Sequence, residues 1–294
     1  MIILGADLGG TSMRVRVFDG DVSRGHAHGA GRPMRSGEGA PLAAALAELA
    51  RPLLLQTRTV RADALVVGAA GAGREIERVE LQSALEQQRL AWRVVVTTDA
   101  ELARAAAFEG GPGVLLIAGT GSIAVARDER GGTRRVGGLG WRMGDQGSAY
   151  WLAAQALEGV GAMHDGLGRV THLAEAMCAG ARVAGMAALA RWSATATPTE
   201  VAALGPAVLA CADRGDPVAV SIRNQAVEAL VSLAVSAGAA KLPVALSGGL
   251  IAPDGPLHEA VASTLETRHG AVVMRRAIDP CRGAVVFARI PQGA

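Results

Sequence analysis

Three acidic residues in this sequence stand where a carboxylate can do chemistry. Asp7 directly follows the apolar run 2–6, and Asp99 closely follows the strand-like run 93–96. A carboxylate at the end of a buried strand is costly unless it binds a cation or accepts hydrogen bonds. Asp7 is therefore a candidate cation ligand, with capping of its own turn as the alternative. Asp99 is a candidate general base for a hydroxyl group, with helix capping as the alternative. Asp145 is the acidic side chain of a glycine-dense segment that precedes a helix.

Two tight turns between apolar runs could hold an anion. One contains Gly9-Gly10-Thr11, and the other is Gly119-Thr120-Gly121-Ser122. Each predicts a β-hairpin whose turn presents backbone N–H groups and hydroxyls, which suits phosphate. The matching Gly-Thr pairs begin at Gly10 and Gly119, an offset of 119 − 10 = 109 residues. This repeat predicts two related domains that face a shared cleft, although glycine-rich turns without a ligand are the alternative.

Periodicity predicts strands that alternate with helices, which is typical of an α/β fold. Residues 21–38 are predicted to be irregular, with room for a third strand. The other predicted strands are 2–6, 13–18, 64–68, 93–96, 114–117, 123–126, 244–246 and 271–274. The predicted helices are 41–56, 75–89, 97–108, 148–163, 170–178, 182–193, 198–213, 217–240, 257–265 and 279–290.

The composition indicates a globular chain of two domains. The 294 residues are 50% hydrophobic and 19% charged, and 29 basic against 27 acidic residues give a net charge of +2, so nothing favours a nucleic-acid partner. Cys178, Cys211 and Cys281 are dispersed and odd in number, which fits a reducing cytosol without a metal-ligand motif. The N-terminus lacks the pattern of a signal peptide. Because serines and Lys241 interrupt the longest apolar stretch, 229–240, we expect a cytoplasmic protein without a membrane span.

Two common nucleotide-binding motifs are absent from the sequence. The glycine-rich stretch 68–73 follows a predicted strand, but its spacing is not GxGxxG. No GxxxxGK[ST] is present either, so the chain is not a P-loop enzyme.

The sequence closely resembles N-acetylglucosamine kinases and the wider BadF/BadG/BcrA/BcrD ATPase family of the sugar kinase, Hsp70 and actin superfamily. The resemblance rests on these segments in order: AxDLGGTSMRV, VVVTTDAELARA, VLLIAGTGSIAVA, GGLGWRMGDQGSAYWLAAQAL, RGDPVA, VALSGGL and CRGAVVFA. It implies two ribonuclease-H-like (actin-like ATPase) α/β domains with ATP and substrate in the interdomain cleft. The first domain would hold residues 1–112, with 279–294 packing back on it, and the second would hold 113–278.

The resemblance also implies how ATP is held. The residues that match the first phosphate loop are Asp7, Gly9, Gly10 and Thr11. Those that match the second are Gly119, Thr120, Gly121 and Ser122. Those that match positions around the adenosine are Gly215, Gly248, Gly249 and Ala284. Asp7 also matches the residue near hydrated Mg²⁺, so ATP and Mg²⁺ are the expected cofactors.

The reaction that the resemblance implies is phosphorylation of the 6-hydroxyl of an amino sugar, above all N-acetylglucosamine. Asp99 matches the catalytic base, and Asp145, with Gly138 and Gln146, matches the side of the site that binds the sugar. The family also contains ATP-driven dehydratase activators that hold an iron–sulfur cluster, which is the alternative function. A regulator that has lost activity is a third hypothesis. Relatives are commonly dimers, so the resemblance implies a homodimer.

Several positions depart from the family pattern and leave the sugar open. Leu139 replaces the usual Trp of GGWG, with Trp141 two residues later, and Gln146 replaces the usual Glu of GDEGS. The family's sugar-binding Asn has no clear match, because Met34 or Arg35 stands roughly there. An arginine at that place suits an acidic sugar such as N-acetylmuramic acid. Kinases for glucosamine or glucose are further alternatives.

Overall fold

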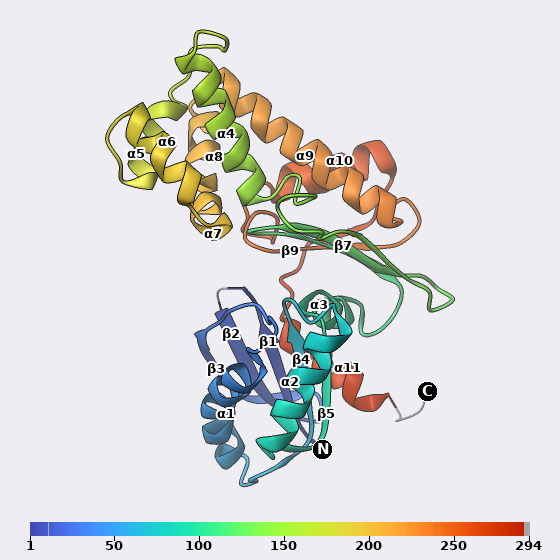
Figure 1. The fold of residues 1–294 in the computed structure, drawn as a ribbon. Coiled ribbons are helices and arrows are strands. Elements are labelled where there is room, and N and C mark those ends of the chain that lie inside the picture. The colour runs from blue at the N-terminus through green and yellow to red at the C-terminus, as the bar shows by residue number, and fades with distance from the viewer. Residues whose placement is uncertain (11, 291–294) are drawn as a thin grey trace. The chain divides into compact units, whose positions relative to one another are not determined.

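The computed structural model describes residues 1–10 and 12–290, and the chain forms two compact units. Unit 1 comprises Met1–Pro112 and Ile278–Ala294, and unit 2 comprises Gly113–Ala277. Figure 1 traces both from the N-terminus to the C-terminus. Each unit is a mixed sheet with helices packed against it.

Unit 1 is built on a five-stranded sheet in the order β3-β2-β1-β4-β5. The strands are β1 (Ile2–Leu8), β2 (Ser12–Asp19), β3 (Val22–Ala30), β4 (Ala62–Ala69) and β5 (Ala91–Thr97). Strands β1, β2 and β3 form an antiparallel meander, while β4 pairs in parallel with β1 and with β5. The helices are α1 (Gly39–Gln56), α2 (Glu75–Gln87), α3 (Asp99–Phe108) and α11 (Gly283–Arg289), with the 3-10 helix η1 (Pro280–Arg282).

Strand β1 sends alternate residues to the two faces of its sheet, which fixes where Asp7 lies. Leu4, Ala6 and Leu8 belong to the core cluster formed with α1 and α2. Ile3 belongs to the other cluster, which contains residues of α3 and α11. Because side chains alternate along a strand, Asp7 lies on the face that α3 and α11 cover.

Unit 2 repeats this plan with a sheet in the order β10-β9-β6-β7-β8. The strands are β6 (Gly113–Ala118), β7 (Ser122–Arg127), β8 (Thr133–Gly137), β9 (Val244–Ser247) and β10 (Val273–Met274). The helices are α4 (Ala149–His164), α5 (Leu173–Ala181), α6 (Met186–Thr195), α7 (Pro198–Ala202), α8 (Gly205–Asp213), α9 (Pro217–Ala237) and α10 (His258–His269). These helices lie on one side of the sheet (Figure 1) and share one large core with β6, β7 and β9.

The two sheets have the same topology, so the predicted α/β fold with two related domains is confirmed. In both, three antiparallel strands are followed by two strands parallel to the first. In both, a glycine-containing turn follows the first strand. The repeated Gly-Thr pattern in the sequence thus marks a repeated structural unit.

Some predicted elements were wrong in extent. The helix predicted over 198–213 is two helices, α7 and α8. The long helix α9 ends at Ala237 because Gly238 adopts φ of +118°, a left-handed conformation that ends a helix. Strand β8 was not predicted, and residues 22–30, expected to be irregular with room for a strand, form β3.

Helix α9 is the one helix among the described residues that is long and apolar enough by itself to span a membrane. It also belongs to the core of unit 2, where Ala226, Leu230 and Ala234 are fully buried. Its composition is therefore explained by core packing, as is common for a central helix.

Candidate active site

Asp7 and Asp99 lie near each other at one edge of the sheet in unit 1. Asp7 on β1 stands beside Gly68 of β4, and Gly68 stands beside Thr97, the last residue of β5. Asp99 follows two residues later as the first residue of α3. The carboxyl ends of parallel strands meet at one sheet edge, so the topology delivers both carboxylates to the same place.

The structure excludes helix capping as the role of the Asp99 side chain. The N-cap of α3 is Thr98, whose hydroxyl accepts a hydrogen bond from the Glu101 N–H at 3.1 Å. Asp99 therefore stands in the first helical turn, where a negative charge is favourable. Its capping was the alternative to a catalytic role, and Thr98 supplies that cap instead.

Burial and, next in importance, the neighbouring charge of Asp99 raise the pKa of Asp7 from 3.8 to about 6. Arg14, the partner of Asp7 across the β1–β2 pair, opposes this rise, while Asp279 adds to it. The site thus holds two interacting carboxylates whose repulsion a cation would relieve.

Two glycines fix helix α3, and with it Asp99, against the sheet. A Cβ on Gly68 would lie 2.6 Å from the Cβ of Leu102, and a Cβ on Gly283 would lie 2.0 Å from the Leu102 carbonyl oxygen. Only glycine leaves room for this approach. The sequence alone did not show that Gly68 and Gly283 allow this close packing.

The first predicted phosphate loop is a tight turn between β1 and β2. The Gly9 N–H donates to the Ser12 carbonyl at 2.9 Å. Gly10 is exposed, and a Cβ there would meet no atom within 4 Å. Thr11, also predicted for this loop, lies outside the described residues.

The second predicted phosphate loop is anchored by the start of α4. The Ala149 and Tyr150 N–H groups donate to the carbonyls of Gly119 and Thr120, at 2.9 and 3.3 Å. Within the described part of the chain, the N–H groups of Thr120 and Gly121 have no partner. Hydrogen bonds from α4 hold the carbonyls of this turn, so its unpaired N–H groups can be presented to an anion.

Ser122 has a different role from the predicted phosphate contact. Its N–H donates to Asp145 Oδ1 at 3.1 Å, and its hydroxyl donates to the Gln146 carbonyl at 2.8 Å. The side chain is only 3% exposed. Both donors of Ser122 thus hold the segment that carries Asp145, and its contact with phosphate stays a prediction.

Asp145 lies directly beside the turn at Gly121. A Cβ on Gly121 would be 2.8 Å from Asp145 Oδ1, so the close approach requires glycine. Asp145 adopts φ of +62°, which is strained for a residue with a side chain. Burial raises the pKa of Asp145, against the opposing effect of the Ser122 N–H. Gly138, with φ of +67°, begins the loop to Asp145, and Gln146 is exposed beside it.

An aromatic group lies on the same loop. The rings of Trp141 and Tyr150 are 5.5 Å apart, and the Arg142 guanidinium lies 4.6 Å from the Trp141 ring centroid. Leu139, at the position where relatives usually carry Trp, is 65% exposed. Trp141 thus has two ring contacts that help to order the loop.

Gly248 and Gly249 follow β9 next to the second phosphate loop. A Cβ on Gly248, whose φ is +89°, would lie 2.4 Å from the Ala118 carbonyl oxygen. The Gly249 N–H lies 3.9 Å from the Cβ position of Gly119. The structure therefore brings these glycines together with Gly119 at the carboxyl ends of β6 and β9.

The other two predicted adenosine positions lie in different surroundings. Gly215, with φ of +85°, forms the turn between α8 and α9. The next residue, Asp216, caps α9 and accepts hydrogen bonds from Thr171 Oγ1 and the His172 N–H. Ala284 belongs to unit 1 and is fully buried in its core, where it packs against Gly5.

The two residues proposed where relatives carry a sugar-binding Asn differ in burial. Met34 is buried in the core of unit 1, and its N–H donates to the Ala70 carbonyl at 2.7 Å. Arg35 is exposed. Of the two, only Arg35 offers a side chain to a ligand.

These features define an actin-like ATPase fold: two units of one topology, with carboxylates at the strand ends of unit 1 and unpaired turn amides in unit 2. The chain belongs to the BadF/BadG/BcrA/BcrD ATPase family, whose profile matches residues 4–288.

Curated relatives of the chain are sugar kinases. An N-acetylmuramic acid/N-acetylglucosamine kinase of Clostridium acetobutylicum is 27% identical over 77% of each chain. An N-acetyl-D-glucosamine kinase of Dictyostelium discoideum is 28% identical over 60% of this chain and 59% of its own length.

Solved structures of similar fold are also named as sugar kinases. A protein of Chromobacterium violaceum, provisionally assigned as an N-acetylglucosamine kinase, has a TM-score of 0.82 and 28% identity, over 98% of this chain and 99% of that one. A Streptomyces griseus ROK family glucokinase with bound glucose and AMPPNP has a TM-score of 0.59 at 17% identity over 98% of each chain, a likeness of fold alone.

Proposed function

We propose that this protein transfers the γ-phosphoryl group of ATP to the 6-hydroxyl of N-acetylglucosamine, with Asp99 as general base. The chain is an ATP-dependent sugar kinase by its family and relatives. The observation that carries the finer proposal is the pair of interacting carboxylates, Asp7 and Asp99, at one sheet edge of unit 1. The reaction uses cytoplasmic ATP, so we place the enzyme in the cytoplasm.

Each carboxylate has its own task in this proposal. Asp99 orients the sugar hydroxyl and accepts its proton as the hydroxyl oxygen attacks the γ-phosphorus of ATP and ADP leaves. Asp7 lies deeper in the sheet, where burial disfavours its charge. Such a buried carboxylate is suited to hold a cation rather than to exchange protons with water.

The residues of unit 1 fit Mg²⁺, which the family implies. Asp7 is half-buried beside a second carboxylate, and burial together with the charge of that carboxylate raises the pKa of Asp7. Mg²⁺ prefers carboxylate oxygens and keeps several waters, so Asp7 would hold the hydrated ion. When bound with ATP, Mg²⁺ neutralises phosphate charge.

The amides of Thr120 and Gly121 would bind phosphate oxygens of ATP. They are unpaired within the described chain, and the first turn of α4 holds the carbonyls of the same loop. Donors that are fixed in advance stabilise developing charge without reorganisation. Gly248 and Gly249 would let the nucleotide approach the backbone beside this loop.

The sugar would be bound by Asp145, together with Gly138 and Gln146. Asp145 is held by the Ser122 N–H at 3.1 Å, and its strained backbone favours a role in binding. N-acetylmuramic acid is the competing substrate, because the exposed side chain of Arg35 on unit 1 suits an acidic sugar. One relative is named for both sugars.

The chemistry of the cysteines does not favour a dehydratase activator. Burial raises the pKa of the Cys281 thiol to about 12, and burial also raises the pKa of Cys211. Ligation of iron needs thiolates, which a raised pKa disfavours.

The test is ADP release measured with N-acetylglucosamine, N-acetylmuramic acid, N-acetylmannosamine, glucosamine and glucose. We expect N-acetylglucosamine to give the highest kcat/KM. Replacing Asp99 with Asn should lower kcat by about 10²–10⁴-fold and leave ATP binding, measured by calorimetry, nearly unchanged. The matched control is Asp254→Asn, an exposed residue of unit 2. Unchanged turnover of D99N would exclude Asp99 as base, and ADP release that no sugar stimulates would refute the kinase.

A further inference from the structure

A cavity of about 860 Å³ lies within unit 2, between the β7–β8 turn and the loop from α9 to β9. Its volume falls in the range of small-ligand pockets, about 300–1,000 Å³. We propose that this cavity is a second binding site, for a small ligand that carries a phosphate group. The residues that argue for this are Asp128, Glu129, Arg130, Arg134 and Lys241.

The cavity is remote from the predicted phosphate loop of the same unit. Strand β7 begins at Ser122, beside that loop, and ends at Arg127, next to the cavity. At about 3.3 Å per residue, five residues of strand separate the two ends by roughly 17 Å. Strand β9 likewise begins next to Leu242 of the cavity and ends next to Gly248. The cavity thus lies at the opposite end of these strands from the turns that we assign to ATP.

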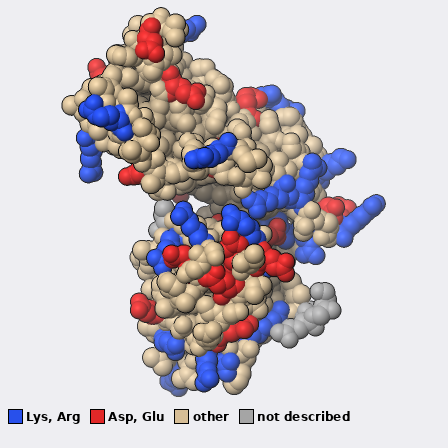
Figure 2. Space-filling model, in the orientation of Figure 1, with Lys and Arg blue, Asp and Glu red and all other residues tan. Residues whose placement is uncertain are grey.

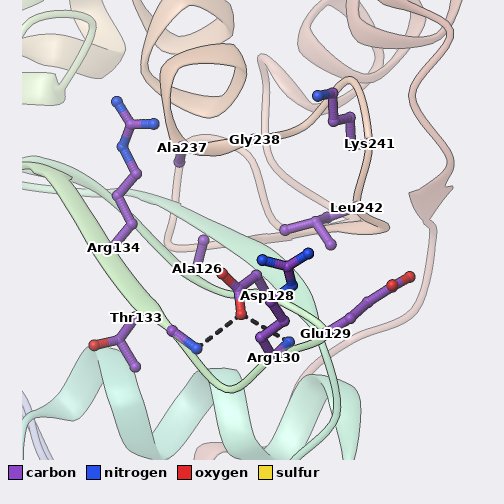
Figure 3. A pocket seen from close by; sticks show the side chains of 11 residues that line it. Ala126, Asp128, Glu129, Arg130, Thr133, Arg134, Ala237, Gly238, Lys241 and Leu242 are labelled. Carbon is purple, nitrogen blue, oxygen red and sulfur yellow. Dashed lines mark hydrogen bonds between the residues drawn. The ribbon is translucent and has the colours of Figure 1, made fainter.

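Three cations line the cavity and lack acidic partners. Arg130, Arg134 and Lys241, the only lysine of the chain, form no ion pair with any described residue. Figure 3 shows Arg134 extending from β8 toward the end of α9, and Lys241 on the loop that follows α9. The space-filling view has basic side chains gathered where the β7–β8 hairpin lies in Figure 1 (Figure 2).

The two carboxylates at the cavity do not neutralise these cations. Asp128 Oδ1 accepts hydrogen bonds from the N–H groups of Arg130 and Gly132, at 2.9 and 2.7 Å, so it serves the turn itself. Glu129 extends away from the turn (Figure 3). Three positive and two negative side chains leave a net charge of 3 − 2 = +1 around the cavity.

Three arginines of unit 2 that lie outside the cavity have acidic partners. Arg268 pairs with Glu228, Arg275 pairs with two glutamates, and Arg223 pairs with Asp213. Arg130, Arg134 and Lys241 have no such partners among the described residues, and all three line the same cavity. A dianionic phosphate group would relieve their repulsion, and guanidinium groups bind phosphate oxygens in pairs.

The experiment measures binding to the full chain while the catalytic site is occupied. Calorimetric titrations use inorganic phosphate and glucose 6-phosphate as separate probes, with AMPPNP, Mg²⁺ and N-acetylglucosamine at saturation. The test variant is Arg134→Gln with Lys241→Gln. The matched control is Arg169→Gln with Arg191→Gln, which removes the same charge from two exposed arginines of the same unit.

We expect at least one probe to bind with a stoichiometry near one and to bind at least about tenfold more weakly to the test variant. Binding of glucose 6-phosphate alone would assign the site to an organic phosphate, and binding of both probes would show that the phosphate group suffices. Equal weakening in both double variants would reduce the effect to general charge and overturn the proposal. Failure of both probes to bind the unmodified chain would also overturn it. Neither result would affect the kinase proposal, which rests on other residues.

Discussion

Asp7→Asn should make the protein more stable while it removes activity. Burial, together with the charge of Asp99, raises the pKa of Asp7 from 3.8 to about 6. The folded protein therefore holds an ionised carboxylate in a place that disfavours charge. Asparagine has the same shape without the charge, so the variant should relieve this cost and lose the proposed hold on Mg²⁺.

The expected magnitude follows from the pKa shift. Each pKa unit corresponds to about 1.4 kcal/mol, so a shift of about two units corresponds to an upper limit of roughly 3 kcal/mol. We expect Asp7→Asn to gain about 1–3 kcal/mol at pH 8, since the amide does not reproduce every hydrogen bond of the carboxylate. The pKa of Asp7 is higher in the folded protein than in the unfolded chain, and this fixes the direction in which stability changes with pH. Wild-type stability therefore falls as pH rises from about 4 to 6 and is constant above that range with respect to Asp7.

The assay is urea unfolding of both proteins from pH 4.5 to 8, with EDTA and without nucleotide. Trp92 is the tryptophan of unit 1 and reports on that unit. The gain in the free energy of unfolding should be small at pH 4.5 and maximal above pH 7. Glu48→Gln, an exposed change on α1, is the control and should show no such pH dependence. A variant less stable than wild type at pH 8, or a gain independent of pH, would refute the reasoning.

Other changes test the second unit and its supports. Gly121→Ala should lower kcat/KM by about tenfold or more, because its Cβ would lie 2.8 Å from Asp145 Oδ1 and displace the side chain that we propose binds the sugar. Gly161→Ala is the control, since a Cβ there meets nothing within 4 Å, and it should keep wild-type kinetics in the same coupled assay. Asp216→Ala should lower the free energy of unfolding by roughly 2–4 kcal/mol at pH 7, because it removes the cap of α9 and leaves Thr171 without its acceptor. Burial raises the pKa of Asp216, but the hydrogen bonds to its carboxylate outweigh burial, so the net pKa is lowered. The loss of stability in Asp216→Ala should therefore shrink as pH falls below about 4. A loss of stability that stays the same at low pH would contradict this reasoning.

The sequence predicted the strand ends and turns of the site because these depend on local pattern. A short apolar run followed by glycine specifies a strand and its turn, so Asp7 and Gly119 could be placed without knowledge of the rest of the chain. The same holds for the two-domain plan, because the Gly-Thr turns repeat at a fixed offset. Strand β3 was less predictable, since its residues are polar and exposed at the sheet edge and lack an apolar period.

The remainder of the site depends on contacts between distant segments. Ser122 resembles a phosphate ligand in sequence, and only the fold brings Asp145, 23 residues away, to its N–H. Gly68 and Gly283 lie in segments that the sequence singles out, but their packing against Leu102 becomes visible only in the fold. The Thr98 cap could have been found from its sequence, since Thr followed by Glu101 matches a capping box, which leaves Asp99 one place too late to be the cap.

The two copies of the repeated hairpin differ in charge along their first strand. In unit 1 the next-to-last residue of the first strand is a carboxylate, Asp7, whereas β6 of unit 2 contains no charged residue. A carboxylate placed next to a turn takes up the amides of that turn, as Asp145 does with the Ser122 N–H. In unit 2 the carboxylate of Asp145 takes up the N–H of Ser122 alone, so the N–H groups of Thr120 and Gly121 stay without a partner among the described residues.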